Sequence, residues 1–371
     1  MQNIHGIIFS YEKPSRLGEL TAHRIQGSVP YAGDTRVIDF ILSDLKNAGC
    51  NDVGVIMHGK CQSLLDHLGS GKSWDLSRRS GGLKLLPMFA AYEDRDVGTG
   101  RFRGKMEALN CARGYVEHIR QEYVVLCDSD IAINLPLQDV VQSHIDTGAD
   151  ITCVCTDHPG GQDDVYFTLD GTDRITDVAI DISNPTGWRS LNIFVIKKDL
   201  LLHLMEDCAA HNERELQTDV LQKRCREMVF RGWKWQGYEA HVSTVAGYYQ
   251  RSMELLDPAV RGQLFDPARP IYAKENDAPS SYIDPTAECV NSLISEGCNI
   301  QGTVRNSIIC RGVRIEKDAV VENCVLCKNT VVKRGAAIRC IIADKGVEFG
   351  EGATLLGHED YPIVVAKNAK V

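Results

Sequence analysis

The sequence predicts a two-part α/β protein, in which a domain with a mostly parallel β-sheet precedes a left-handed parallel β-helix. Three observations lead to this fold class. Apolar runs alternate with amphipathic helical segments over residues 1–256, a proline-containing connector covers 257–287, and short groups of apolar residues spaced six apart then follow over 288–371. Continuous apolar runs suit strands covered on both faces, and a six-residue period is typical of a β-helix.

The first part contains five short apolar runs that we expect to be strands of the sheet. They are Ile4–Phe9, Val53–Met57, Tyr123–Cys127, Ile151–Cys155 and Leu191–Ile196. Amphipathic helices are expected between them, because apolar residues recur there at helical spacing. Two examples are Arg36–Ala48 and Lys105–Arg120.

The last part has one aliphatic residue at each step of six, as the inside of a triangular coil requires. These residues are Ile294, Ile300, Ile309, Ile315, Val321, Leu326, Val332, Ile338, Phe349 and Leu355. One coil takes about three such steps, so we expect Cys310 and Cys327 on adjacent coils, and likewise Cys324 and Cys340.

Composition narrows the classes of function. The chain has 371 residues, and 41 Lys and Arg against 50 Asp and Glu give a formal net charge of −9. A net acidic chain argues against nucleic acid and anionic membrane as partners, although a local basic pocket can still bind a small anion. We see no apolar span of membrane length and no signal peptide, so we expect a cytoplasmic protein.

The 14 cysteines are expected to be reduced thiols, because disulfide frameworks are typical of short secreted chains. Cys153 and Cys155 alternate within an apolar run and should share one face of a strand. Cys324 and Cys327 have zinc-knuckle spacing, but no second pair follows at a suitable distance. We therefore favour packing in the core over metal binding for these residues.

Several segments carry a more specific pattern. They are Arg36–Ser43 with Asn47–Gly49, Gly69–Leu76, Arg103–Gly104, Glu122–Asp130, Ser190–Ile196 and Tyr248–Leu256. In this order they resemble motifs of the ADP-glucose pyrophosphorylase (glucose-1-phosphate adenylyltransferase) family, and the resemblance extends over nearly the whole chain. It implies a Rossmann-like nucleotidyltransferase domain before the β-helix, and a reaction that converts ATP and glucose 1-phosphate to ADP-glucose and pyrophosphate.

That reaction depends on positioning and neutralising phosphate groups, so a glycine-rich loop, basic side chains and two Mg²⁺-binding carboxylates are expected. The loop at Phe9–Leu17 departs from the family pattern, because Tyr11, Glu12 and Pro14 stand where three glycines belong. Tyrosine and glutamate adopt positive φ only at a cost, and proline lacks an N–H donor. Glu12 also adds negative charge near the phosphates. Arg16 of the loop is retained.

The other parts are incomplete as well. Gln26–Gly27 replaces a Lys-Pro pair, and Asp181–Pro185 holds no counterpart of the Glu-Lys-Pro segment that binds sugar phosphate. Asp130 matches the first metal-binding aspartate, whereas His241 replaces the second, and Mg²⁺ prefers oxygen to imidazole. Gly104, in the Arg-Gly motif, completes this degenerate nucleotide-binding region. We therefore expect no catalytic residues, no bound metal and no cofactor.

The resemblance is closest to bacterial regulatory subunits that lack catalytic activity and pair with a catalytic subunit in glycogen synthesis. It implies a homo- or heterotetramer that contains a catalytic paralogue, with phosphorylated sugars or glycolytic intermediates as effectors. Arg24, Arg36 and Arg339 match by position the arginines that bind such effectors in the family. An arginine fork suits phosphate oxygens, but surface ion pairs would explain each arginine equally well.

An active sugar-1-phosphate nucleotidyltransferase with a divergent loop is the alternative hypothesis. It would use Mg²⁺, and its candidate residues are Lys13, Arg16 and Lys105 for the triphosphate and Asp128 and Asp130 for the metal. Asp128 and Asp130 are spaced to face one side of a strand. Pro14 and Glu12 still oppose triphosphate binding, and Asp130 is also explained as a buried carboxylate that caps a turn.

An acyltransferase that uses the β-helix is a third hypothesis, from another class of enzyme. Such an enzyme needs a histidine between coils as a general base. No histidine occurs between His241 and His358, and His358 follows the last coil. The sequence therefore disfavours this hypothesis.

Overall fold

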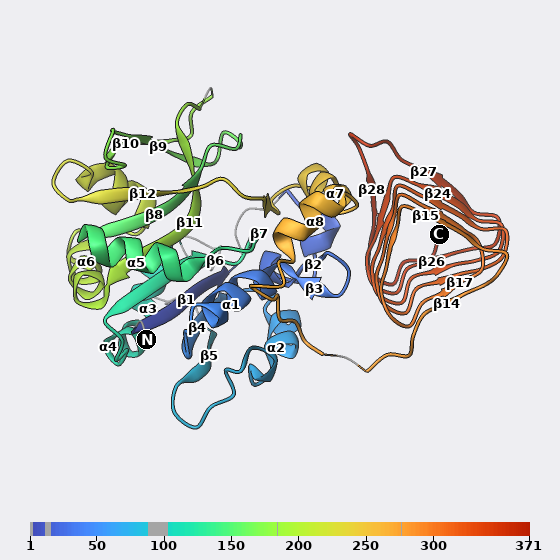
Figure 1. Ribbon diagram of the computed structural model, residues 1–371, viewed down its shortest axis with the longest axis horizontal. Coiled ribbons are helices and arrows are strands. Elements are labelled where there is room, and N and C mark those ends of the chain that lie inside the picture. Colours follow the sequence, from blue (N-terminus) through green and yellow to red (C-terminus); the bar gives the residue numbers. More distant parts are fainter. Residues whose placement is uncertain (1–2, 12–15, 88–102, 184, 276) are drawn as a thin grey trace.

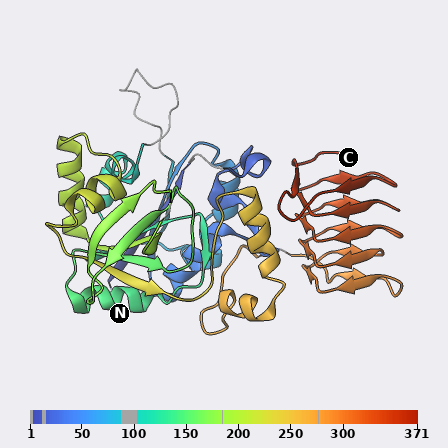
Figure 2. The same ribbon diagram turned by 90° about the horizontal axis from the view of Figure 1, so that it is seen from above.

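The computed structural model describes residues 3–11, 16–87, 103–183, 185–275 and 277–371. The chain forms an α/β domain and a triangular β-helix, which lie side by side with two helices between them (Figure 1). In the perpendicular view, the coils of the β-helix stack in a short column beside the α/β domain (Figure 2). Within the described residues, no helix has both the length and the apolar character needed to cross a membrane.

A nine-stranded sheet forms the centre of the α/β domain. Its strands are β1 (Ile4–Tyr11), β4 (Asp52–His58), β5 (Gly82–Pro87), β6 (Tyr123–Asp128), β8 (Ile151–Thr156), β9 (Val165–Leu169), β10 (Ile175–Ile180), β11 (Trp188–Lys197) and β12 (Phe230–Trp235). β1 lies between β4 and β6 and is parallel to both, and β5 extends this parallel part. β11 is antiparallel to β6 and β8, so the five expected runs are strands of a mixed sheet.

Helices cover both faces of this sheet. They are α1 (Val37–Asn47), α2 (Gln62–Leu68), α3 (Lys105–Cys111), α4 (Arg113–Glu117), α5 (Leu137–Thr147) and α6 (Lys198–Ala210). Ile7 and Phe9 of β1 belong to the core under α3, α4 and α6, whereas Ile8 belongs to the core under α1, α2 and α5. The helix expected over Lys105–Arg120 is divided at Ala112 into α3 and α4. Cys153 and Cys155 share one core, as predicted.

Short elements connect the domain to the β-helix. They are β2 (Pro30–Tyr31), β3 (Thr35–Arg36), β7 (Ile131–Ile133), β13 (Glu239–His241), α7 (Val245–Glu254), α8 (Pro258–Leu264), the 3-10 turns η1 (Gly18–Thr21), η2 (Gln26–Ser28) and η3 (Lys72–Trp74), and the π-helical turn η4 (Leu216–Gln222). The Thr244 hydroxyl caps α7 by accepting the Gly247 N–H at 3.0 Å. β13 pairs with β7 and places His241 opposite Ile131, next to the end of β6.

Three parallel sheets form the sides of the β-helix. The first contains β14 (Tyr282–Ile283), β17 (Asn299–Ile300), β20 (Arg314–Ile315), β23 (Val331–Val332) and β26 (Glu348–Phe349). The second contains β15 (Glu288–Val290), β18 (Thr303–Arg305), β21 (Val320–Glu322), β24 (Ala337–Arg339) and β27 (Thr354–Leu356). The third contains β16 (Leu293–Ile294), β19 (Ile308–Ile309), β22 (Val325–Leu326), β25 (Ile341–Ala343) and β28 (Ile363–Val365).

The aliphatic residues at the six-residue steps point into this triangle and form one core. Ile294 and Leu355 are only partly buried, because they lie in the first and last coils. The first strand begins at Tyr282, before the expected domain start at residue 288. The left-handed parallel β-helix predicted from the repeat is thus present and one strand longer at its start.

The third sheet, β16–β19–β22–β25–β28, contacts the α/β domain, and we call it the docking sheet. Beside its inward residues it carries a second apolar column that faces outward: Leu293, Ile308, Val325, Ile342 and Val364. These residues pack with Leu17, Tyr31 and Tyr248 of the α/β domain. The register of the coils therefore aligns these outward residues into the apolar surface that contacts the α/β domain.

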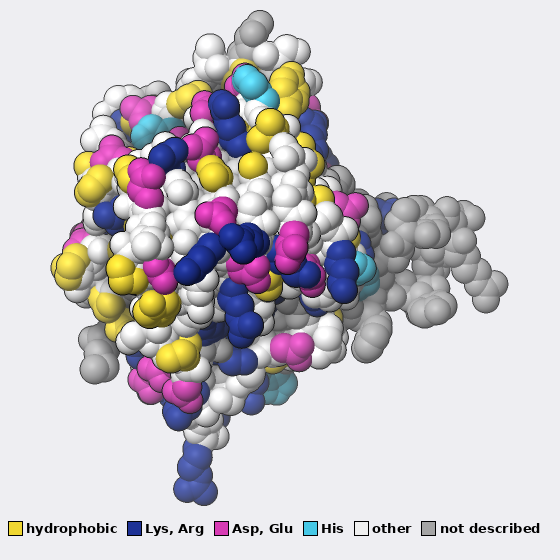
Figure 3. Space-filling model, turned by 90° about the vertical axis from the view of Figure 1, so that its right-hand side faces the viewer, with side chains coloured by type: hydrophobic (Ala, Val, Ile, Leu, Met, Phe, Trp, Pro, Cys, Tyr) yellow, Lys and Arg dark blue, Asp and Glu magenta, His cyan; other side chains and the backbone are white. Residues whose placement is uncertain are grey.

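The opposite side of the β-helix is solvated. Figure 3 shows Lys and Arg side chains interspersed there with Asp and Glu. Arg334 pairs with Asp318 at 3.1 Å, and Lys333 pairs with Glu348 at 2.5 Å. Exposed pairs of this kind contribute about 0–1 kcal/mol each. Both of these cations are thus matched by neighbouring acids.

Candidate functional site

The carboxyl ends of β1 and β6 lie side by side at one edge of the sheet, where parallel α/β sheets bind their ligands. β1 ends at Tyr11, and Glu12 and Pro14 of the expected degenerate loop lie outside the described residues. The Tyr11 side chain is buried, with its ring edge-on to Phe9 at 6.2 Å between centroids. Tyr11, which stands in place of the first loop glycine, therefore adds an aromatic ring to the core.

Arg16 lies at the rim of this edge. Its side chain is 75% exposed, and its guanidinium pairs with Asp163 at 2.9 Å. The Arg16 N–H donates to the Ser243 carbonyl, and the Arg16 carbonyl accepts from the Val245 N–H, both at 3.2 Å. The retained arginine thus ties the chain to the start of α7, and its charge is matched by an acid.

A buried ion pair connects the start of α3 to the end of β6. Lys105 Nζ lies 3.2 Å from Asp128 Oδ2, and the two side chains are 4% and 0% exposed. The same Nζ lies 6.0 Å from the centre of the Phe9 ring. Breaking such a pair by removing one partner leaves a buried charge without compensation. Lys105 and Asp128 therefore neutralise each other at the position where the alternative hypothesis needs them for substrate and metal.

The backbone donors at the start of α3 are also occupied. The N–H groups of Met106 and Glu107 donate to the Arg214 carbonyl at 2.9 and 3.1 Å. A Cβ on Gly104 would lie 2.3 Å from that carbonyl oxygen, so the close approach of the two segments requires glycine. Free N–H groups at a helix start would suit a phosphate, but here the protein itself accepts from them.

His241 lies between two carboxylates next to this pair. His241 Nε2 is 3.5 Å from Asp130 Oδ2, and His241 Nδ1 is 3.8 Å from Asp164 Oδ1. Burial acts to lower the pKa of His241, but the hydrogen bond and charge of Asp130 and the charge of Asp164 outweigh it and raise this pKa. We call Lys105, Asp128, Asp130, His241 and Asp164 the sheet-edge site.

The sheet-edge site does not fit Mg²⁺. The imidazole of His241 occupies the position between Asp130 and Asp164, and Mg²⁺ requires oxygen ligands in octahedral geometry. Across the described parts of the chain, no three His, Cys, Asp or Glu side chains form a group that could hold a metal ion.

The segment that replaces the Lys-Pro pair is neutral and closely packed. The Gln26 side-chain amide donates to the Val242 carbonyl. A Cβ on Gly27 would lie 2.5 Å from Ser129 Oγ, which in turn donates to Ser10 Oγ at 2.8 Å. A proline ring has no room at residue 27, so this part of the sheet edge is fixed by hydrogen bonds among uncharged groups.

A second group of charges lies at the junction between the α/β domain and the docking sheet. Arg24 Nη2 pairs with Asp344 Oδ2 at 2.5 Å, and both side chains are at least 97% buried. Arg24 Nη1 is buried and has no hydrogen-bond partner among the described residues. Arg36 Nη1 donates to the Ser63 carbonyl at 2.6 Å. With Lys345, these residues form what we call the junction cluster: Arg24, Arg36, Lys345 and Asp344.

The cations of the junction cluster act on one another. Burial, followed by the charges of Arg36 and Arg24, lowers the pKa of Lys345 to about 8. Burial and Arg24 lower the pKa of Arg36 to about 10, against the opposing effect of Asp39. Three cations thus share a partly desolvated site with two buried acids, Asp344 and Asp39. An anion bound there would relieve their mutual repulsion.

Arg339 does not join this cluster. It is exposed on β24, before the start of β25, whereas Asp344 and Lys345 follow the end of β25. Sequence reasoning missed Asp344, Lys345 and Asp164. The outward apolar column of the docking sheet could have identified Lys345, because it shows which side of the β-helix faces the α/β domain.

Comparison with known protein families matches residues 5–178 to the nucleotidyl transferase family and residues 280–360 to the GlmU-like C-terminal hexapeptide family. The chain is 33% identical over 364 residues to the glycogen biosynthesis protein GlgD of Bacillus subtilis (strain 168), which covers 98% of this chain and 95% of the relative. It is 30% identical over 314 residues to the glucose-1-phosphate adenylyltransferase of Geobacillus stearothermophilus, a match that covers 83% of this chain and 80% of the relative. It is also 30% identical over 329 residues to the enzyme of the same name from Thermotoga neapolitana, a match that covers 87% of this chain and 77% of the relative.

Proposed function

The chain belongs to the glucose-1-phosphate adenylyltransferase family, and from this premise we propose that it is a catalytically degenerate, regulatory subunit in glycogen biosynthesis. Its partner would be a catalytic paralogue that converts ATP and glucose 1-phosphate to ADP-glucose and pyrophosphate. The two would assemble as a tetramer in the cytoplasm, and a phosphorylated sugar or glycolytic intermediate would act as allosteric effector. The chain itself would need no cofactor.

The observation that carries the proposal is the matching of charges at the sheet-edge site. The reaction requires cations free to meet a triphosphate and carboxylates free to hold Mg²⁺. Lys105 is instead paired with Asp128, and His241 lies between Asp130 and Asp164. These internal pairs thus neutralise the side chains whose charges the substrate and the metal would otherwise neutralise.

The junction cluster supports the regulatory part of the proposal. Arg24 and Arg36 come from the α/β domain, and Lys345 comes from the β-helix, just after β25 of the docking sheet. A phosphate group bound by all three would contact both units at once. Its binding would therefore favour one arrangement of the docking sheet against the α/β domain, which is the differential contact that allosteric control requires.

The alternative, an active nucleotidyltransferase, loses most of its expected groups to internal pairs. Arg16 pairs with Asp163 and Lys105 pairs with Asp128. Lys13 lies outside the described residues. No contact among the described residues favours catalysis by this chain alone.

The test is an assay of a purified catalytic paralogue with and without this chain. We expect the chain alone to release pyrophosphate from ATP and glucose 1-phosphate no faster than a protein-free control. We expect the mixture to respond to phosphorylated sugars at about tenfold lower concentration than the paralogue alone, which corresponds to a coupling free energy of about 1.4 kcal/mol.

A matched pair of variants assigns this response to the junction cluster. Arg36→Gln with Lys345→Gln removes two cations there, and we expect it to abolish the added response. Arg334→Gln with Lys333→Gln removes two exposed cations on the opposite side of the β-helix, and we expect it to preserve the response. A chain that forms no complex with the paralogue and leaves its regulation unchanged would contradict the proposal.

A further inference from the structure

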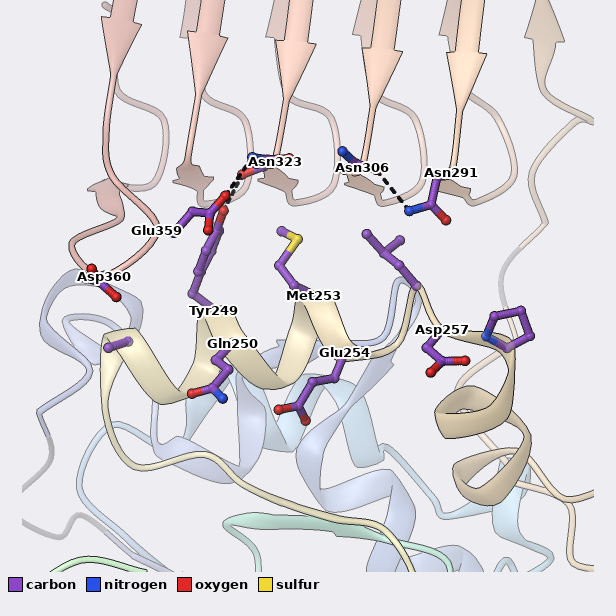
Figure 4. A pocket seen from close by; sticks show the side chains of 13 residues that line it. Tyr249, Gln250, Met253, Glu254, Asp257, Asn291, Asn306, Asn323, Glu359 and Asp360 are labelled. Atoms are coloured by element: carbon purple, nitrogen blue, oxygen red, sulfur yellow. Dashed lines mark hydrogen bonds between the residues drawn. The ribbon is translucent and has the colours of Figure 1, made fainter.

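A groove of about 770 Å³ runs between α7 and one corner of the β-helix (Figure 4). None of its lining residues belongs to the sheet-edge site or to the junction cluster. Tyr249, Met253 and Glu254 of α7 line one side of it, and Asn306 and Glu359 of the β-helix line the other. The size is within the range of about 300–1,000 Å³ that is typical of binding sites.

The lining of this groove is acidic. Glu254, Asp257, Glu359 and Asp360 line it, and its described lining contains no lysine, arginine or histidine. Arg251 pairs with Glu254 at 3.0 Å, so part of one charge is matched from α7 itself. The remaining excess of carboxylates favours a cationic occupant and disfavours a phosphorylated one.

The groove is elongated along the axis of the β-helix. Asn291 Nδ2 donates to Asn306 Oδ1 at 2.9 Å on the next coil, and Asn323 Nδ2 donates to Glu359 Oε1 at 3.2 Å. The coils of Asn291 and Glu359 are four steps apart. At about 4.8 Å per step this is about 19 Å, the length of about six residues of extended chain.

Large apolar side chains are exposed at both ends of the groove. Tyr361 is 81% exposed and shares a tight turn with Glu359 and Asp360, and Val290 next to Asn291 is 46% exposed. An exposed tyrosine beside a groove is typical of a surface that a macromolecule covers. Inside the groove, Tyr249 is only 4% exposed, so it offers no ring face for stacking on a sugar.

We propose that this groove binds an extended segment of a partner protein in which lysine or arginine residues alternate with apolar residues. In an extended chain, successive side chains point to opposite sides. One set of side chains faces α7 and contacts Met253, and the other faces the β-helix and meets Glu359 and Asp360. The inference holds whether or not the junction cluster binds an effector.

The test measures binding of a fluorescein-labelled hexapeptide of alternating arginine and leucine by fluorescence anisotropy at about 150 mM salt, where surface steering is largely screened. We expect Glu359→Lys with Asp360→Lys, two exposed positions on one turn, to weaken binding at least tenfold. Met253→Gln, which removes an apolar contact and no charge, is expected to weaken it about threefold.

A charge-matched control uses Asp177→Lys with Glu227→Lys, two exposed positions on other elements, and we expect binding within twofold of the unmodified chain. A hexapeptide of alternating glutamine and leucine should not bind. The proposal is overturned if the arginine peptide does not bind, or if the Glu359/Asp360 variant binds as tightly as the control variant. It is also overturned if spermidine alone displaces the peptide at equal charge concentration, because a small cation would then suffice.

Discussion

The sheet edge and the junction between the two units are both rich in charged side chains, but their charges are balanced differently. At the sheet edge each basic side chain has an acid beside it: Lys105 has Asp128, and His241 lies between Asp130 and Asp164. At the junction, three cations share two buried acids, Asp344 and Asp39. This difference teaches that charged residues alone do not indicate a binding site. An unmatched excess of positive or negative charge at a partly desolvated position does.

The largest expected effect comes from breaking the sheet-edge balance. Lys105→Met leaves Asp128 buried without its cation, and we expect a loss of about 3–5 kcal/mol in the free energy of unfolding. Adding Asp128→Asn to this variant should recover part of the loss, because the uncompensated charge is then absent. Denaturant unfolding of the two single variants and the double variant measures the coupling. Additive losses would show that the pair does not interact as described.

The next effect concerns anion binding at the junction. Fructose 1,6-bisphosphate, a phosphorylated sugar that is also a glycolytic intermediate, serves as the probe. Arg36→Gln with Lys345→Gln should weaken its binding at least tenfold, or about 1.4 kcal/mol, because two of three cations are removed. Calorimetric titration measures the affinity, and Arg334→Gln with Lys333→Gln is the control. Equal affinities of the two double variants would place the anion elsewhere.

The pH dependence of this binding should follow Lys345, whose pKa is about 8 in the folded chain. The ammonium is present below this pH and lost above it, so affinity should fall about tenfold between pH 7 and 9 if the anion requires the charged form. Because the folded pKa lies below the ordinary value of 10.5, deprotonation does not destabilise the fold, and the loss is not due to unfolding. Lys345→Arg should remove most of this pH dependence. A pH dependence that Lys345→Arg leaves unchanged would assign it to another group.

A smaller effect is expected when the imidazole between the two acids is replaced. His241→Asp removes the imidazole and gives three carboxylates in one place, which suits Mg²⁺. At Mg²⁺ concentrations about five times the dissociation constant, binding should stabilise this variant by about 1 kcal/mol, or raise its Tm by about 2–4 °C. The unmodified chain should show no such rise. Thermal unfolding with Mg²⁺ and with a matched concentration of NaCl separates binding from ionic strength.

The smallest effect concerns Arg339, which is exposed and lies apart from the junction cluster. Arg339→Gln should change the affinity for fructose 1,6-bisphosphate by less than twofold in the same titration. A tenfold loss would show that β24 contributes to the anion site and would enlarge the junction cluster beyond the residues named above.

The repeat part of the fold was predictable because each step of the β-helix is a local signal. Ile309 and Leu326 occupy the same place on adjacent coils, and both are buried as the six-residue period required. The strands of the sheet were also predictable as apolar runs. The direction of β11 was not, because an apolar run carries no information on whether its neighbour is parallel.

The candidate site was only partly predictable. Tyr11, Asp130 and His241 were identified because each stands at a position of a recognisable motif. Asp164 lies on no motif, and its approach to His241 depends on the packing of distant segments. Lys345 required knowledge of which side of the β-helix contacts the α/β domain. Local patterns thus predicted which positions differ from the family motifs. They did not predict which side chains pair with the residues at those positions.

The most direct test of this account is calorimetric titration of fructose 1,6-bisphosphate into two variants of the full chain. One is Arg36→Gln with Lys345→Gln at the junction, and the other is Lys105→Met with Asp128→Asn at the sheet edge. We predict that the first loses at least tenfold in affinity and that the second binds as the unmodified chain does. Loss of binding in the sheet-edge variant, with binding retained in the junction variant, would contradict the account.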